Sequence, residues 1–228
     1  MNAPAPSVLV VDDSATSRLV IEKQLRKFGC RVQGAEDGRS ALAALHADKF
    51  DLVLLDCYMP DMNGYEVARQ VRENEGDGSD GYTPLIGISA EADAAHVQLC
   101  LDSGMDGILG KPLPLEEFKK LLSLWCDFDV DAEAAITNAQ PDIGTLDLKA
   151  LFRNTSLQDL AALRSAYEGA DVAAVQRLAH RMKGAALTMN RGEIVEVLDR
   201  IEAAARGGLD GDADIGALIA TLDGALHA

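Results

Sequence analysis

Five polar side chains stand at the ends of short apolar runs in the first half of the sequence. They are Asp12, Asp13, Asp56, Ser89 and Lys111. Singly, an Asp or a Ser in such a place is usually a helix cap or a turn residue, and a Lys is usually solvated. Three carboxylates drawn together would repel one another unless a divalent cation joined them, and oxygen ligands suit Mg²⁺ better than Zn²⁺. A lysine and a hydroxyl beside that cation would complete a site that holds a phosphoryl group on one Asp.

His180 is a second candidate for phosphoryl chemistry. The apolar residues around it repeat at helical spacing: Val175, Leu178, Met182, Ala186 and Met189. A histidine on such an Ala-rich helix is more often structural than reactive, but His180 lies roughly 155° around the helix from this stripe. We therefore expect an exposed imidazole, which is a competent phosphoryl acceptor. Its face is expected to offer a docking surface of basic, small and apolar residues: Arg177, Lys183, Gly184 and Leu187.

The elements that would position the first group alternate along the chain between short apolar runs and amphipathic stretches. The runs lie at 8–11, 31–35, 52–55, 85–88 and 107–109. Helices are expected near 15–28, 38–47, 64–73, 91–103 and 114–126, with Ser14 as the first N-cap and Gly29 and Gly104 at helix ends. Continuous apolar runs fit strands that are buried on both faces. We predict a doubly wound five-stranded α/β sheet, in which the carboxyl ends of the strands meet at one edge.

The composition changes after Cys126. Residues 127–144 carry five acids, no base and little apolar content beyond alanine, so we expect a linker there. After it no strand pattern appears. Ala- and Leu-rich segments with helical spacing lie near 155–168, 171–189, 193–206 and 213–227. Four helices joined by short loops predict a bundle. We expect two domains, at 7–126 and 145–228.

Four motifs run in order along the first domain. They are VLVVDDS at 8–14, LVLLDCYMPDMNGYE at 52–66, ISA at 88–90 and GKP at 110–112. Together they resemble the receiver domain of two-component response regulators, which has a flavodoxin-like fold. The resemblance implies that Asp56 is the phosphoacceptor and that a set of four oxygen donors holds Mg²⁺. This set is Asp12, Asp13, Asp56 and the backbone carbonyl of Tyr58.

The same resemblance assigns further roles near the phosphoacceptor. Ser89 is implied as the hydroxyl switch and Lys111 as the partner of the acyl phosphate, with a cis peptide between Lys111 and Pro112. One position departs from the family pattern: three residues before the lysine the family commonly has Tyr or Phe, whereas this chain has Ile108. We therefore expect no full Ser-aromatic switch.

Residues 180–184, His-Arg-Met-Lys-Gly, resemble the HxxKG motif of histidine phosphotransfer (HPt) domains. The motif is short, but a helix bundle after a receiver makes it more specific. The resemblance implies that His180 carries a phosphoryl group. Nothing in the sequence resembles the ATP-binding half of a histidine kinase, so we expect no loading from ATP by this chain. Were the chain part of a hybrid sensor, its parent would be a histidine kinase.

Composition excludes several other classes of protein. The formal net charge of −16, from 37 acids and 21 bases, disfavours nucleic acid as the main partner. No apolar run approaches the roughly 20 residues that span a bilayer, and the first residues show no signal-peptide pattern. Four cysteines without metal-ligand spacing are expected to be buried, reduced thiols: Cys30, Cys57, Cys100 and Cys126. We expect a cytoplasmic protein that neither binds DNA nor inserts into a membrane.

These observations predict a phosphorelay intermediate in which Asp56 and His180 exchange a phosphoryl group. A sensor histidine kinase would act upstream, and the receiver of a response regulator downstream. A phosphate sink, which drains a kinase by hydrolysing the Asp56 phosphate, is an alternative. A phosphohydrolase of the haloacid dehalogenase type also uses Mg²⁺, Asp, Ser and Lys, but its nucleophile follows the first strand, where this chain has the acid pair. A transcription factor is disfavoured because no basic recognition helix follows the receiver. The direction of phosphoryl flow, and the choice between a free-standing protein and a hybrid-kinase fragment, stay open.

Overall fold

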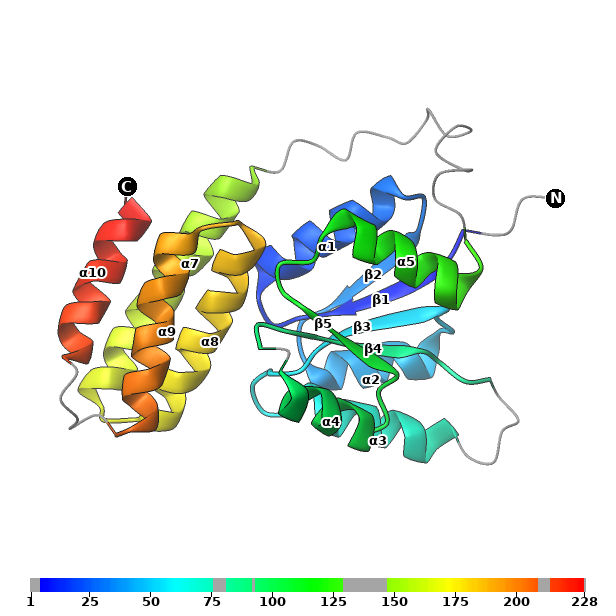
Figure 1. The fold of residues 1–228 in the computed structure, drawn as a ribbon, viewed down its shortest axis with the longest axis horizontal. Coiled ribbons are helices and arrows are strands. Elements are labelled where there is room, and N and C mark those ends of the chain that lie inside the picture. The colour runs from blue at the N-terminus through cyan, green and yellow to red at the C-terminus, as the bar shows by residue number, and fades with distance from the viewer. Residues whose placement is uncertain (1–4, 76–80, 92, 129–146, 209–213, 228) are drawn as a thin grey trace. The chain divides into compact units, whose positions relative to one another are not determined.

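The computed structural model describes residues 5–75, 81–91, 93–128, 147–208 and 214–227. The chain divides into two compact units, Met1–Thr145 and Leu146–Ala228. The first unit mixes strands with helices, and the described part of the second contains helices only (Figure 1). Among the described residues, the first unit has two hydrophobic core clusters and the second has one.

Five parallel strands form the sheet in the described part of the first unit, in the order β2-β1-β3-β4-β5. The strands are β1 (Ser7–Val11), β2 (Arg31–Ala35), β3 (Leu52–Asp56), β4 (Leu85–Ser89) and β5 (Gly107–Gly110). The three inner strands are buried almost throughout, as expected for strands with neighbours at both edges and helices on both faces. The predicted doubly wound fold is confirmed.

Helices cover both faces of this sheet (Figure 1). They are α1 (Ala15–Lys27), α2 (Gly38–Ala47), α3 (Gly64–Glu75), α4 (Ala94–Asp102) and α5 (Leu115–Cys126). Side chains alternate across the strands, so β1 contributes to two cores. Val8 and Val10 pack with α1 and α5, while Leu9 and Val11 pack in the cluster that holds α2, α3 and α4.

Local signals fix the ends of several helices. The Ser14 hydroxyl accepts a hydrogen bond from the Ser17 N–H and caps α1, as predicted. Gly29 and Gly104 follow α1 and α4 with φ of 88° and 91°, the left-handed conformation that glycine adopts readily. The helix predicted at 91–103 is shorter than expected. It begins at Ala94 because Asp93 caps it, accepting from two backbone N–H groups.

Most of the predicted linker lies outside the described residues. Of 127–144, the structure describes Asp127, which ends α5 in a left-handed conformation, and Phe128. Phe128 is 2% exposed and packs in the same core cluster as α1 and α5. The first unit therefore includes at least one apolar side chain from the segment expected to be a linker.

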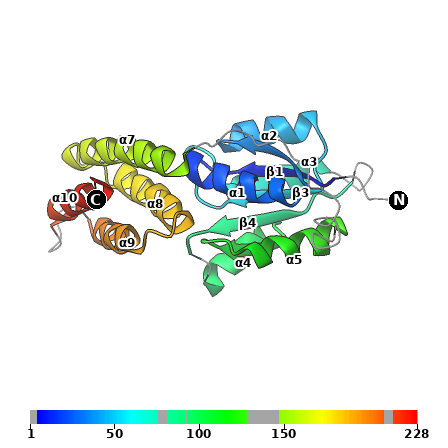
Figure 2. The same ribbon diagram turned by 90° about the horizontal axis from the view of Figure 1, so that it is seen from above.

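Four helices make up the described part of the second unit, and Figure 2 shows how they lie beside one another. They are α7 (Leu148–Glu168), α8 (Val172–Thr188), α9 (Gly192–Arg206) and α10 (Ile215–His227). Each helix packs on the next, and α10 closes against α7 around one apolar core, so the predicted bundle is confirmed. The first helix begins earlier than the expected residue 155, because Asp147 caps it. No helix in the described ranges is long and apolar enough to cross a bilayer.

Candidate functional site

The parallel strands deliver three carboxylates to one edge of the sheet. Asp12 and Asp13 follow β1 directly, and Asp56 is the last residue of β3, the neighbouring strand. One carboxylate oxygen from each residue lies within 4.8 Å of the other two. Asp12 and Asp56 are buried, and Asp13 is half-buried. The acidic cluster predicted from the sequence is therefore present.

Lys111 lies between two of these acids. Its Nζ atom is 2.8 Å from Oδ2 of Asp12 and 2.7 Å from Oδ2 of Asp56, and its side chain is almost completely buried. Burial, reinforced by the Asp56 carboxylate and opposed by Lys111, raises the pKa of Asp12 to about 6. Burial alone would lower the pKa of Lys111, but the two carboxylates outweigh it and raise that pKa above its ordinary value. The lysine therefore stays charged and touches the predicted phosphoacceptor.

The donor set at this edge fits a hard divalent cation. Its oxygens belong to three carboxylates, and one lysine offsets only part of their charge. Oxygen-only ligands and excess negative charge are what Mg²⁺ requires, whereas the nitrogen and sulfur ligands typical of Zn²⁺ are absent from this cluster. The Tyr58 N–H donates to Asp56 Oδ1 at 3.1 Å, which places the Tyr58 peptide beside the acids.

The loop after Asp56 requires a glycine. A Cβ atom on Gly64 would lie 2.3 Å from the backbone oxygen of Asp56, closer than any side chain allows. The Gly64 N–H also donates to the Cys57 carbonyl at 3.1 Å. Ser89, at the end of β4, is fully buried, and its hydroxyl accepts from the Glu91 N–H. The Lys111–Pro112 peptide is cis, as expected.

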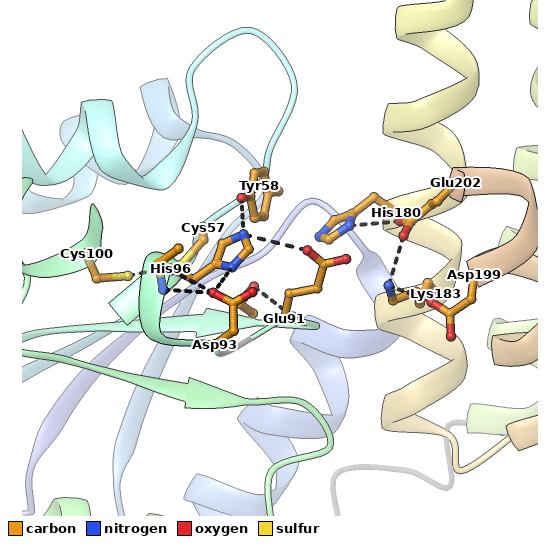
Figure 3. Close-up of polar contacts among 12 residues, drawn as sticks. Cys57, Tyr58, Glu91, Asp93, His96, Cys100, His180, Lys183, Asp199 and Glu202 are labelled. Atoms are coloured by element: carbon orange, nitrogen blue, oxygen red, sulfur yellow. Dashed lines mark hydrogen bonds and ion pairs between the residues drawn. The ribbon is translucent and has the colours of Figure 1, made fainter. Parts of the chain in front are cut away.

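A polar cluster that was not predicted from the sequence surrounds His96 of α4 (Figure 3). The His96 ring bonds the Tyr58 hydroxyl through Nε2 at 2.7 Å and the Asp93 carboxylate through Nδ1 at 2.9 Å. Glu91 lies 3.6 Å from Nε2. The Asp-x-x-His spacing at a helix start was the available signal, but the long-range contact with Tyr58 had none. The cluster ties the loop after Asp56 to the first turn of α4.

His180 lies on α8 and is half-buried rather than exposed. Its Nδ1 atom is 3.0 Å from Oε1 of Glu202 on α9, and its side chain is 19% exposed. The predicted apolar stripe is correct, since Val175 and Met182 are buried in the core. The predicted exposure was wrong because a helix in a bundle is covered by two neighbours, so its contact surface is wider than one stripe.

Lys183 and Gly184 correct the predicted docking surface further, because both are buried. The Lys183 Nζ is 2.8 Å from Oδ1 of Asp199 and 2.9 Å from Oε2 of Glu202 (Figure 3). Burial opposes but does not cancel the effect of these acids, and the pKa of Lys183 is raised. Arg177 is exposed as predicted. Of the expected surface, Arg177 and the half-buried Leu187 are thus accessible.

Glu202 joins His180 to Lys183 and was missed by sequence analysis. Burial alone would raise its pKa, but hydrogen bonds from His180 and then Lys183 outweigh burial and lower it. Ile194, Leu198 and Ile201 form the buried face of α9, and Glu202 lies on the same face. A buried acid needs a buried partner, so the position of Glu202 on the apolar stripe of α9 was the available signal that it pairs with another side chain.

Comparison with known families matches residues 8–123 to the response regulator receiver domain and residues 147–228 to the Hpt domain. The chain therefore belongs to the response regulator receiver family, and its receiver domain is followed by an Hpt domain. Among relatives, it is 30% identical over 240 residues to the virulence sensor protein BvgS of Bordetella parapertussis. The aligned region covers 94% of this chain and 19% of that protein. It is 33% identical to the sensor histidine kinase AruS of Pseudomonas aeruginosa, over 89% of this chain and 21% of that protein.

The chain thus spans about a fifth of the length of these curated relatives. Among solved structures, chemotaxis protein CheY4 of Vibrio cholerae matches 53% of this chain and 98% of its own, at 32% identity and a TM-score of 0.49. A receiver and an Hpt domain in one chain, with sensor kinases among the relatives, support a role in a phosphorelay.

Proposed function

We propose that this chain relays a phosphoryl group between Asp56 of its receiver and His180 of its Hpt domain. The observation that carries the proposal is the environment of Asp56, whose carboxylate lies 2.7 Å from the Lys111 ammonium in a cluster of three acids. The proposed domains are 7–126 and 145–228, joined by a linker at 127–144. The upstream partner would be a sensor histidine kinase, and the downstream partner the receiver of a response regulator. The relay would run in the cytoplasm, where the ATP that loads a sensor kinase is found.

Magnesium would be held by the carboxylates of Asp12, Asp13 and Asp56 and by the backbone carbonyl of Tyr58. When bound, it supplies positive charge that offsets the charge of a phosphoryl group. The chain's own residues do the rest. An oxygen of the Asp56 carboxylate attacks phosphorus, the bond between phosphorus and the donor atom breaks, and the donor leaves with that electron pair. The Lys111 ammonium, 2.7 Å from Asp56, and the Ser89 hydroxyl, at the end of the neighbouring strand β4, would contact the new phosphoryl oxygens.

At His180 the Glu202 carboxylate selects the reacting nitrogen. A carboxylate can only accept, so the hydrogen of the neutral ring must lie on Nδ1, and Nε2 carries the lone pair. Transfer from Asp56 forms a bond between Nε2 and phosphorus and breaks the acyl C–O–P linkage at the P–O bond, which regenerates the carboxylate. The ring gains positive charge in this step, and Glu202 stabilises that charge.

Labelling with radioactive acetyl phosphate tests which residues accept the phosphoryl group. The wild-type chain should acquire a base-labile acyl phosphate on Asp56 and an acid-labile, base-stable phosphohistidine on His180. Asp56→Asn should acquire neither, because His180 would receive its group through Asp56. His180→Gln should keep the acyl phosphate alone. Phosphohistidine in Asp56→Asn, or acyl phosphate that persists in that variant, would contradict the proposal.

A further inference from the structure

Two buried thiols meet beside the phosphoacceptor strand. The Sγ atoms of Cys57 and Cys100 lie 3.7 Å apart, and both residues are fully buried (Figure 3). Cys57 directly follows Asp56 at the end of β3, and Cys100 lies on α4. Their proximity therefore links the loop that carries the proposed phosphoacceptor to a helix.

Gly87 of β4 leaves the space in which these sulfurs meet. A Cβ atom at this position would lie 3.1 Å from Cys57 Sγ and 3.2 Å from Cys100 Sγ. It would also lie 3.0 Å from the Met105 sulfur, so three sulfur atoms converge over one glycine. A side chain at Gly87 would push the two thiols from their positions, because contacts this short require the neighbour to move.

We propose that Cys57 and Cys100 are an oxidation site at which a hydroperoxide converts the thiol pair to a disulfide, cross-linking the end of β3 to α4. A disulfide has a sulfur–sulfur distance of about 2.05 Å, so the two sulfurs must approach by about 1.7 Å.

The movement falls to α4, because the backbone of Cys57 is held on both sides. The Cys57 N–H donates to Ile88 at 3.0 Å, and its carbonyl accepts from Gly64. Within α4, all of whose residues are described, Cys100 is the only buried one. A helix anchored by so little buried surface opens at low cost, and such opening admits a small oxidant to the thiols.

Backbone contacts distinguish the two thiols. Cys57 lies in the loop whose backbone is held, whereas Cys100 lies on the helix whose opening would expose its sulfur, so Cys100 meets the oxidant first. Cys57, whose Sγ atom is 3.7 Å away, is placed to act as the resolving thiol.

The reaction balances with one molecule of hydrogen peroxide, the simplest hydroperoxide. The Cys100 thiolate attacks one peroxide oxygen, the O–O bond breaks, and the leaving hydroxide takes a proton to become water, leaving a sulfenic acid. The Cys57 sulfur then attacks the sulfenic sulfur. The S–S bond forms, the S–O bond breaks, and the hydroxide leaves with the Cys57 proton as a second water. The thiol pair loses two electrons and the peroxide gains them.

The other two cysteines are less suited to this oxidation, and the test below removes them. Cys30 is buried and Cys126 is half-buried, a departure from the expectation that all four thiols are buried. Burial first, and then the neighbouring Cys126, raises the pKa of Cys30 to about 12, while burial and Asp51 raise the pKa of Cys126 to about 11. Both thiols are thus held protonated at neutral pH and should react slowly.

The test treats the full chain, carrying Cys30→Ala and Cys126→Ser, with hydrogen peroxide under native conditions. The product is then unfolded in excess iodoacetamide and mapped by mass spectrometry. We expect most chains to be lighter by two hydrogen atoms, with Cys57 and Cys100 joined in one peptide pair and released by dithiothreitol. Adding Cys57→Ser should abolish this species and leave Cys100 as a sulfenic or sulfinic acid.

Other products would overturn the proposal. If both thiols are alkylated after treatment, the pair does not react. If the added mass is oxygen on Met105, or sulfonic acid on either cysteine in the chain that retains both thiols, the two sulfurs do not reach each other. A mixed disulfide between two chains, seen as a dimer in non-reducing gels, would likewise contradict a cross-link within one receiver.

Discussion

Both proposed phosphoryl sites contain a buried lysine paired with carboxylates, but the lysine contacts the acceptor side chain in only one of them. At the receiver site, the Lys111 ammonium contacts the phosphoacceptor Asp56 itself, at 2.7 Å. In the helix bundle, Lys183 contacts Glu202, and Glu202 contacts His180, so the lysine is separated from the acceptor by a carboxylate. The first lysine is placed to pair with an incoming phosphoryl group. The second is committed to two acids and acts on the histidine through Glu202.

This difference follows from what each acceptor needs. A carboxylate that accepts a phosphoryl group gathers negative charge, and only cations can offset it. A neutral imidazole instead needs one nitrogen protonated and the ring held in place, which a buried carboxylate provides. The lysine in the bundle then compensates the carboxylate. Removing corresponding groups from the two sites should therefore have unlike effects.

The largest effect should come from removing Mg²⁺ from the receiver site. EDTA should abolish labelling of Asp56 by acetyl phosphate, because three carboxylates and one lysine cannot hold a dianionic phosphoryl group without a further cation. Phosphohistidine already formed on His180 should be stable in EDTA, because no acidic cluster of this kind stands in the described part of the bundle. Scintillation counting of base-labile label measures the first, and labelling that survives EDTA would contradict it.

Loss of the buried lysine in the bundle should be the next largest effect. Lys183→Ala leaves Glu202 and Asp199 without their shared cation, so we expect it to lower the free energy of unfolding by about 3–5 kcal/mol. Arg177→Ala, on the same helix but exposed, should stay within about 0.5 kcal/mol of wild type. Urea unfolding followed by circular dichroism measures both. Equal stabilities of the two variants would mean that Lys183 is not buried.

Replacing Glu202 by Gln should produce a smaller loss that depends on pH. The pKa of Glu202 is lowered in the folded chain from its ordinary 4.5. Its stabilisation is therefore present above pH 4.5 and is lost as the pH falls through the lower, folded value. We expect Glu202→Gln to cost about 1–3 kcal/mol at pH 7 and progressively less below pH 4.5. A cost that stays constant with pH in denaturant titrations would rule out the ionic role.

The smallest effect concerns the link between the receiver loop and α4. Tyr58→Phe removes the hydroxyl that bonds His96 and should lower the free energy of unfolding by about 1 kcal/mol. Hydrogen exchange should quicken in the first turn of α4, where His96 and its partner Asp93 lie. Tyr82→Phe removes a hydroxyl that bonds Asp106, beyond the other end of α4, and is the matched control for exchange in the first turn. Unchanged exchange in Tyr58→Phe would show that the bond does not hold α4.

The sequence was sufficient to predict the acidic cluster, because that cluster depends on the order of the strands. The proximity of Asp12 and Asp56 could be predicted since the carboxyl ends of parallel strands meet at one edge, whatever the detailed packing. The exposure of Lys183 and His180 was predicted wrongly. A helical wheel identifies one apolar stripe but not the second neighbouring helix that covers the adjoining face. The Glu202 partner comes from another helix, 22 residues away from His180. Such a pairing depends on how α8 and α9 pack, which spacing within one helix does not determine.

Transfer between two variants tests the central claim most directly. His180→Gln chain, labelled on Asp56 and freed of acetyl phosphate, is mixed with unlabelled Asp56→Asn chain, which retains His180. We predict that acid-labile, base-stable label appears on the Asp56→Asn chain. Acyl phosphate should also fall faster than when the recipient carries both Asp56→Asn and His180→Gln. If label is lost at the same rate with both recipients and no phosphohistidine forms, Asp56 and His180 do not exchange a phosphoryl group.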